Sequence, residues 1–195
     1  MKKLFITGVL ALGLVGSLNA QVGGSFSNIR LLDIEPKQLG VLIENSSDFD
    51  LRIVDNSGTI LYKERDNKAG YAKRFDLRLL KEGTYKMEIE NTSQITTIPF
   101  KISFRKLIVN KNDRLVMDKP SILNSGMTLK LKMETANLPI DVNIFDEYNH
   151  RVHSKTYREV PTINATFDFS KIGSGTYRMV VSYNSKSFSE TITLQ

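Results

Sequence analysis

Short runs in which apolar and polar residues alternate recur along the whole chain. The clearest run is residues 84–90, where Tyr85, Met87 and Ile89 alternate with charged side chains. A period of two places the apolar side chains on one face of a strand and the polar side chains on the other, so that one face packs on a core and the other meets water. No stretch of the sequence has the period of a long amphipathic helix. The pattern therefore predicts an all-β protein with antiparallel sheets.

Turn-forming residues separate the strands that this pattern predicts in the first half of the chain. Besides 84–90, these strands are residues 28–34, 39–44, 49–55, 59–63 and 95–104. Residues 64–73 are polar and are expected to connect two strands. Pro99 cannot donate a backbone hydrogen bond, so we expect the last strand to lie at a sheet edge or to be bulged at the proline.

One phrase of the sequence occurs twice. Residues 75–87 read FDLRLLKEGTYKM and residues 167–179 read FDFSKIGSGTYRM, so that both the Phe-Asp pair and the Gly-Thr-Tyr triplet recur 92 residues apart. Two copies of the same residue pattern at a fixed spacing indicate a tandem array of one fold. We expect two β-sandwich domains, residues 21–104 and 105–195. Each should hold about seven short strands in an immunoglobulin-like or fibronectin-III-like arrangement.

The repeated phrase also supplies eight candidate site residues, four in each copy. They are Phe75, Asp76, Gly83 and Tyr85, and Phe167, Asp168, Gly175 and Tyr177. The glycine frees the chain as it leaves a turn, and the tyrosine two residues later can donate to a backbone carbonyl across the corner of the sandwich. The aspartate can accept backbone N–H groups of the turn. A ligand site is the alternative, but because both copies keep these residues within one fold, a structural corner is favoured.

The first twenty residues have the composition of a secretory signal peptide. A Met-Lys-Lys start is followed by the apolar residues 4–15 and by small residues before Gln21. The apolar run is short for a transmembrane helix, which makes an uncleaved anchor the weaker alternative. We expect cleavage after Ala20, or failing that after Ser17. The mature chain should then have no transmembrane segment and be exported to the periplasm, the cell surface or the medium.

Composition excludes several classes of function. The chain has no cysteine, so disulfides, thiolate metal sites and a cysteine nucleophile are excluded. The formal net charge is +6, and the lysines and arginines are scattered over many segments. Scattered positive charge does not form the basic stripe of a nucleic-acid-binding protein. We expect no nucleic-acid partner and no cofactor.

No motif of the sequence places an acid–base pair or an activated nucleophile. His150 and His153 lie three apart, so on a strand they point to opposite faces and cannot chelate one metal ion. The acidic turns 55–58 and 146–149 could bind calcium weakly, but they lack the run of oxygen ligands of a tight site and are better explained as turns. We therefore expect neither a metal site nor an enzyme.

The order of these features resembles a known bacterial family. A hairpin with Asp-x-x-Gly precedes Phe-Asp-Leu-x-x-Leu, then Gly-Thr-Tyr, an alternating strand and a final hairpin. This order is similar to the C-terminal sorting domain of the type IX secretion system of Bacteroidetes. It is also similar to small secreted immunoglobulin-like β-sandwich domains of unknown function from that phylum. The resemblance covers residues 49–104 and 140–194, and it implies an exported β-sandwich protein.

Two departures bear on the role that the resemblance implies. A sorting domain occurs once, behind a cargo, whereas two copies are expected to fill the mature chain here. Sorting domains also tend to finish with a lysine-containing strand, whereas this chain ends SETITLQ. We therefore expect a non-catalytic exported protein that binds an envelope protein or a glycan, or gives structural support. The alternative is a sorting-domain-like protein recognised by the secretion machinery.

Overall fold

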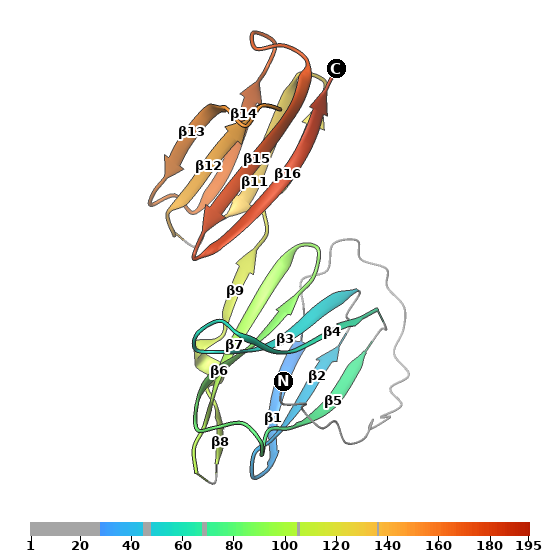
Figure 1. Cartoon of the computed structure of the whole chain (residues 1–195), viewed down its shortest axis with the longest axis vertical. Helices are drawn as coiled ribbons and strands as arrows, with labels where there is room; N and C mark the ends of the chain where they lie inside the picture. Colours follow the sequence, from blue (N-terminus) through green and yellow to red (C-terminus); the bar gives the residue numbers. More distant parts are fainter. Residues whose placement is uncertain (1–27, 45–47, 68–69, 105, 136) are drawn as a thin grey trace. The chain divides into compact units, whose positions relative to one another are not determined.

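The described part of the chain consists of β-strands joined by turns. The computed structural model describes residues 28–44, 48–67, 70–104, 106–135 and 137–195, so the expected signal peptide lies outside it. These residues form sixteen strands and one short 3-10 helix, Lys111–Asp113 (Figure 1). The strand pairs whose register is known are antiparallel, which confirms the predicted all-β fold. Within the described residues no helix is both long and apolar enough to cross a membrane.

The chain divides into two compact units between Val116 and Met117. The first unit contains two sheets. In order across the first sheet, the strands are β1 (Asn28–Glu35), β2 (Gln38–Glu44) and β5 (Tyr71–Asp76). Across the second sheet they are β4 (Ile60–Asp66), β3 (Phe49–Asp55), β6 (Gly83–Glu90), β7 (Gln94–Ile102) and β8 (Leu107–Val109). The short strand β9 (Leu115–Asp118) pairs with β7 and contains the boundary between the units.

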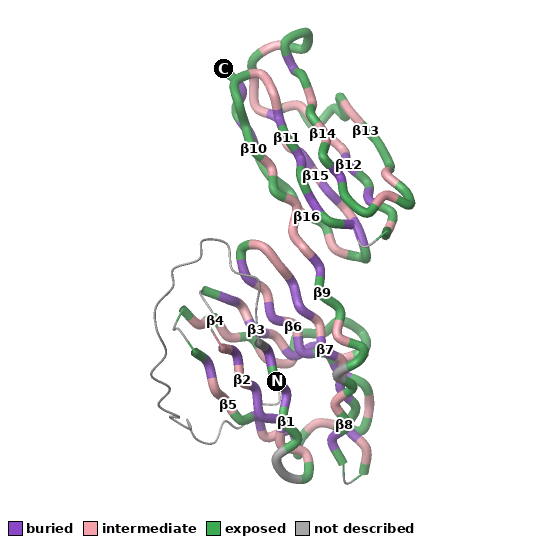
Figure 2. Tube along the Cα trace, turned by 180° about the vertical axis from the view of Figure 1, so that it is seen from behind, coloured by how far each residue is buried: buried purple, intermediate pink, exposed green. Residues whose placement is uncertain are grey.

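Apolar side chains from both sheets of the first unit meet in one core. Leu39 and Phe75 of the first sheet and Leu51 and Met87 of the second are fully buried in the same cluster. Each such side chain contributes about 1.5–3 kcal/mol when it leaves water. Burial alternates along the strands as the sequence pattern requires (Figure 2). The first unit is therefore a β-sandwich.

The second unit repeats this topology with seven strands. One sheet contains β10 (Ser121–Ser125), β11 (Thr128–Glu134) and β14 (Thr162–Asp168). The other contains β13 (Arg151–Tyr157), β12 (Ile140–Phe145), β15 (Gly175–Tyr183) and β16 (Lys186–Leu194). The order β10-β11-β14 corresponds to β1-β2-β5, and β13-β12-β15-β16 corresponds to β4-β3-β6-β7.

The fourth strand of each unit distinguishes between the two predicted arrangements. In a constant-type immunoglobulin domain the fourth strand lies on the sheet that holds the first, second and fifth strands. Here β4 and β13 instead pair with the third strand of their unit, on the opposite sheet. Both units therefore follow the fibronectin-III-like arrangement.

The segment 64–73 is not the connection that its polar sequence predicts. Strand β4 continues to Asp66, and β5 begins at Tyr71 and pairs with β2 along its length. Tyr71, Lys73 and Phe75 share one face of β5 because side chains alternate along a strand. A lysine in the middle of this face interrupts the apolar pattern and conceals the strand from sequence analysis.

The first unit extends beyond Phe104, where the sequence placed its end. Strand β8 pairs with β7, and Leu107 at its start is buried in the core of the first unit. The absence of a Pro- or Gly-rich linker predicts that the second unit starts directly after Phe104.

Pro99 stands opposite Lys86 in β6 without a shift of register. On β7 the pairing with β8 begins one residue later, at Phe100. Pro99, which has no backbone N–H, therefore needs no hydrogen bond to β8.

Candidate functional site

The repeated phrase lies at the turn before β6 in the first unit, where Tyr85 contacts the turn. The hydroxyl of Tyr85 donates a hydrogen bond of 2.7 Å to the carbonyl oxygen of Lys81, across the turn before β6. The Tyr85 ring covers Gly83, where an added Cβ would lie 3.8 Å from the ring. The Tyr85 ring also stacks on Phe100, with centroids 5.6 Å apart. The glycine, the ring and the turn carbonyl thus form one packed corner.

The second unit builds this corner with the equivalent residues. The hydroxyl of Tyr177 donates to the carbonyl oxygen of Gly173 at 3.0 Å. Its ring lies over Gly175, where a Cβ would stand 3.7 Å away. It also packs against Phe169 at a centroid distance of 4.7 Å. The two corners use the same bond, from a tyrosine hydroxyl to the carbonyl four residues earlier.

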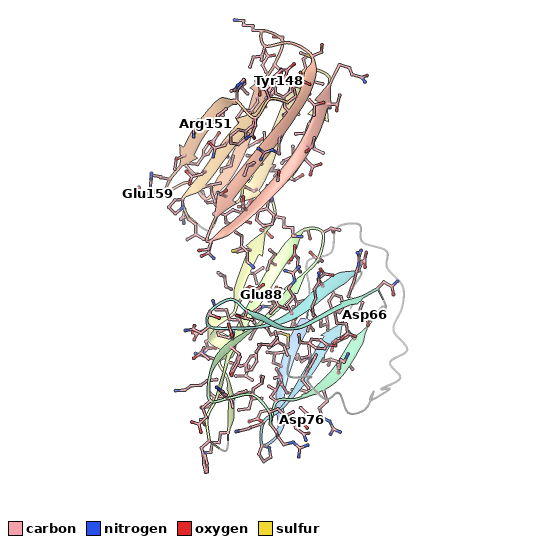
Figure 3. All side chains as sticks on the ribbon, in the orientation of Figure 1. Asp66, Asp76, Glu88, Tyr148, Arg151 and Glu159 are labelled. Carbon is pink, nitrogen blue, oxygen red and sulfur yellow. The ribbon has the colours of Figure 1, made fainter. Side chains whose placement is uncertain are left out.

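The two aspartates of the phrase accept backbone N–H groups in the turn that follows. Asp76 accepts from the amide of Arg78 at 3.1 Å, and Asp168 accepts from the amide of Ser170 at 2.9 Å (Asp76 is labelled in Figure 3). The Arg78 guanidinium also pairs with the Asp76 carboxylate at 2.6 Å and holds the pKa of that carboxyl below its ordinary value. The amide of Ser170 lowers the pKa of Asp168 in the same direction. Both carboxylates therefore accept hydrogen bonds from the backbone of the turn that follows them.

The two phenylalanines of the phrase are not equally buried. Phe75 is fully buried and packs in a T-shaped arrangement with Tyr62, with ring centroids 5.2 Å apart. Phe167 is only half-buried and packs on His153 at 5.0 Å. Tyr62 and His153 hold the same place, because each stands opposite the last inward residue of the third strand of its unit. The repeat therefore keeps the corner but changes the side chains beside it.

A cluster of four polar side chains in the first unit was not found from the sequence. It consists of Tyr62 and Glu64 on β4 and Tyr71 and Lys73 on β5, and we call it the edge cluster. Strand β4 is at the end of one sheet and β5 at the end of the other, so these side chains bridge the open side between the two sheets. Figure 3 labels Asp66, two residues beyond Glu64 at the end of β4.

Glu64 is the centre of the edge cluster. Its Oε2 accepts from the ammonium of Lys73 at 2.5 Å, from the hydroxyl of Tyr62 at 2.5 Å and from that of Tyr71 at 3.1 Å. Lys73 also donates to the Tyr62 hydroxyl at 2.9 Å. Its ammonium lies 5.4 Å from the centre of the Tyr62 ring and 5.8 Å from that of Phe75, distances suited to cation–π attraction.

The electrostatics of the edge cluster favour the charged forms of both ions. Burial opposes the charge of Glu64, but the hydrogen bonds from Lys73 and Tyr62 outweigh it and lower the pKa of the carboxyl. Burial likewise opposes the charge of Lys73, and its bond to Glu64 raises the pKa of the ammonium. Burial is the main cause that raises the pKa of Tyr71 far above its ordinary value. The cluster is thus an ion pair flanked by two phenols whose pKa values are raised.

The second unit does not repeat the edge cluster. The residues in the places of Tyr62, Glu64, Tyr71 and Lys73 are His153, Lys155, Ile163 and Ala165. Burial, with the neighbouring positive charge of Lys155, lowers the pKa of His153. The edge cluster therefore belongs to the first unit alone, unlike the corner.

In each of the two acidic turns, the aspartate side chain accepts hydrogen bonds from backbone amides of the same turn. In the first, Asp55 accepts from the amides of Ser57 and Thr59, both at 2.9 Å. In the second, Asp146 accepts from the amide of Tyr148 at 3.0 Å and from that of His150 at 2.8 Å. These bonds define ordinary β-hairpin turns. Among the described residues no group of three or more acidic or histidine side chains is arranged to hold a metal ion.

Comparison with known proteins supports the resemblance that the repeated phrase predicted. Residues 28–110 match the family model of the secretion system C-terminal sorting domain. The match begins at the first residue of β1 and ends one residue after β8, so it contains strands β1 to β8. A sorting domain marks an exported protein. The chain is thus an exported β-sandwich protein whose first unit resembles this sorting domain.

No curated protein matches the chain. Solved structures similar to it include the BSP domain of a biofilm associated protein and a tetra-tandem repeat in the extending region of a large adhesion protein. They share 13% and 14% identity with the chain, with a TM-score of 0.30 each, and cover 86% of it but only 29% and 48% of their own length. The β-glucuronidase of Parabacteroides merdae is similar at 11% identity and a TM-score of 0.28, covering 83% of this chain and 29% of its own. The chain spans less than half the length of each of these proteins.

Proposed function

We propose that the chain is a non-catalytic exported protein that acts by binding or by structural support in the bacterial envelope or the extracellular space. The observation that carries this proposal is the corner built twice. In both units the tyrosine hydroxyl and the aspartate carboxylate of the repeated phrase are engaged by backbone groups of their own turn. Groups bound in this way stabilise a fold and are not free to act on a substrate. The match of the first unit to an exported family supports the location.

The test uses the purified chain without its expected leader, residues 21–195. We expect it to bind saturably to a glycan array or to outer-membrane vesicles, and a variant unfolded by the loss of both corner tyrosines should not. If both probes stay blank while the chain sediments with envelope fragments, structural support is the better description. Turnover of any substrate in a broad hydrolase panel, abolished in an independently purified unfolded variant, would contradict the non-catalytic part of the proposal.

The family match favours a second candidate function, recognition by the type IX secretion machinery. Under this alternative a unit fused behind an exported reporter should bring the reporter to the cell surface. Delivery should fail in a strain that lacks the secretion apparatus. Each unit is fused separately, because the match lies in the first unit whereas sorting domains follow their cargo. A reporter that stays in the periplasm with either unit excludes this function, and so does a surface-exposed full chain that retains an epitope after Gln195.

A further inference from the structure

A pocket of about 130 Å³ lies in the first unit, and none of the residues that line it belongs to the corner or to the edge cluster. It is lined by Ile29, Arg30 and Leu31 of β1, by Ile98 of β7 and by Arg114, which follows the 3-10 helix. Three of these five side chains are branched and apolar, and two are guanidinium groups. The lining thus combines an apolar wall with positive charge.

The pocket lies beside β1, an edge strand of its sheet. Among the described strands β1 forms backbone pairs only with β2, so no strand is hydrogen-bonded to its other edge, although β8 lies near it. Ile29 and Leu31 are buried while Arg30 between them is exposed, as alternation requires. Ile29, Arg30 and Leu31 follow one another on β1 and all line the pocket, so the backbone of β1 runs beside it.

The two arginines of the pocket differ in their partners. Arg30 pairs with the carboxylate of Glu44 on β2. The Nε of Arg114 is buried, and among the described residues it has no hydrogen-bond partner. A guanidinium stays charged and keeps all its donors at any physiological pH, so a buried Nε without an acceptor is costly to the fold. An acceptor that reached this nitrogen after a shift of the Arg114 side chain would remove the cost.

We propose that this pocket binds a carboxylate that carries a small apolar group. A carboxylate matches the planar donors of Arg114, and the apolar group would contact Ile29, Leu31 and Ile98. A cavity of this size holds about six heavy atoms, since one of roughly 150 Å³ holds benzene. The carboxylate comes either from a free short-chain acid or from the C-terminal residue of a peptide, which would also bond to the edge of β1. The proposal names a ligand class for the proposed binding function and rests on it.

The first experiment is a titration of the purified chain followed by NMR. We expect isovalerate to shift the Nε–H resonance of Arg114 and the backbone amides of residues 29–31, and isovaleramide to leave them in place. Acetyl-Gly-Val and its C-terminal amide form the second pair of probes. Binding of the peptide acid about tenfold tighter than isovalerate, a gain expected from one or two added hydrogen bonds, assigns the ligand to a peptide end. Equal binding of the two acids assigns it to a free acid.

Variants of Arg114 show whether that side chain carries the binding. Arg114→Gln should weaken isovalerate binding at least about tenfold, because a charge-assisted hydrogen bond is lost. Arg114→Lys keeps the charge without the Nε donor and should weaken it less. Arg74→Gln, at an exposed position on β5, is the matched control and should bind like the unchanged chain. Preserved amide spectra show that each variant is folded.

Two results would overturn the inference: equal shifts with the acid and its amide, or unchanged binding by folded Arg114→Gln. Glycan or vesicle binding that persists in either case shows that the proposed function stands and only the carboxylate pocket fails. Loss of carboxylate binding together with all envelope binding would contradict both.

Discussion

A single hydroxyl closes the corner of each unit, and its contribution can be separated from that of the ring. Tyr85→Phe and Tyr177→Phe should each lower the free energy of unfolding by about 1 kcal/mol, since one hydrogen bond to a turn carbonyl is lost. Tyr85→Ala and Tyr177→Ala should cost about 3–5 kcal/mol because the buried ring is lost as well. Urea unfolding measures both. Tyr148→Phe, at an exposed turn (Figure 3), is the control and should change nothing. A fully stable Tyr177→Ala that loses partner binding would show that this tyrosine serves a ligand.

Glu64 gives the first unit a predictable dependence on pH. Its pKa is lowered in the folded state from an ordinary value of 4.5, so its contribution is present above pH 4.5 and is lost as the pH falls through the lowered value. Glu64→Gln should therefore cost about 1–3 kcal/mol at pH 7, and the difference from the unchanged chain should shrink at acid pH. Lys73 has a raised pKa, so its share persists to pH 10.5 and is lost above it. A difference that stayed constant down to pH 2 would contradict the charged pair.

At the scale of single residues, the sequence carries a signal for the contacts of the corner but none for those of the edge cluster. Gly83 and Tyr85 are two residues apart in a repeated phrase, so their meeting depends only on local geometry. Glu64 and Lys73 lie on different sheets, and their contact depends on how the sandwich closes. Arg114 is a further case, because its neighbours in the pocket come from β1 and β7, far away in the chain. Residue type and spacing carry no signal for such contacts.

Strands were found from the sequence wherever one face is apolar without interruption. The edge cluster places Glu64 and Lys73 at inward positions of β4 and β5, and these two strands are the ones whose extent was misjudged. Strand β8 was missed for another reason, because its three residues are too few for an alternating pattern to be detected.

The edge cluster couples two strands that share no backbone pairing, and this coupling can be measured at the scale of the element. Glu64→Gln and Lys73→Met should each destabilise the first unit, because each leaves a half-buried partner unsatisfied. The double variant should cost less than the sum of the two by about 0.5–3 kcal/mol. The control cycle uses Asp48 and Arg65, an exposed pair that should show a smaller coupling. Additive effects in the first cycle would mean that the cluster does not join β4 to β5.

The whole chain is two sandwiches of one topology, and the duplication of the phrase predicted this without locating the boundary between them. Leu107 is the last buried residue in the core of the first unit, and Val109 of β8 packs against it, so this core should form without the second unit. A fragment of residues 21–116 should therefore fold alone. A fragment of residues 21–104, which ends at the boundary expected from the sequence, lacks β8 and the buried side chain of Leu107. It should be less stable by about 2–5 kcal/mol, the cost of removing one large core side chain.

Leu107→Ala in the longer fragment separates the side chain from the strand. It should reproduce most of the loss, while Ile108→Ala, at an exposed position of the same strand, should have little effect. Thermal and urea unfolding of the four proteins give the comparison directly. The family match supports the longer unit, since it continues through β8 to residue 110. Equal stability of the 21–104 and 21–116 fragments would show that β8 is dispensable and would return the boundary to residue 104. A stable longer fragment would make β8 a structural part of the sorting-domain-like unit, so a fusion that tests secretion must include it.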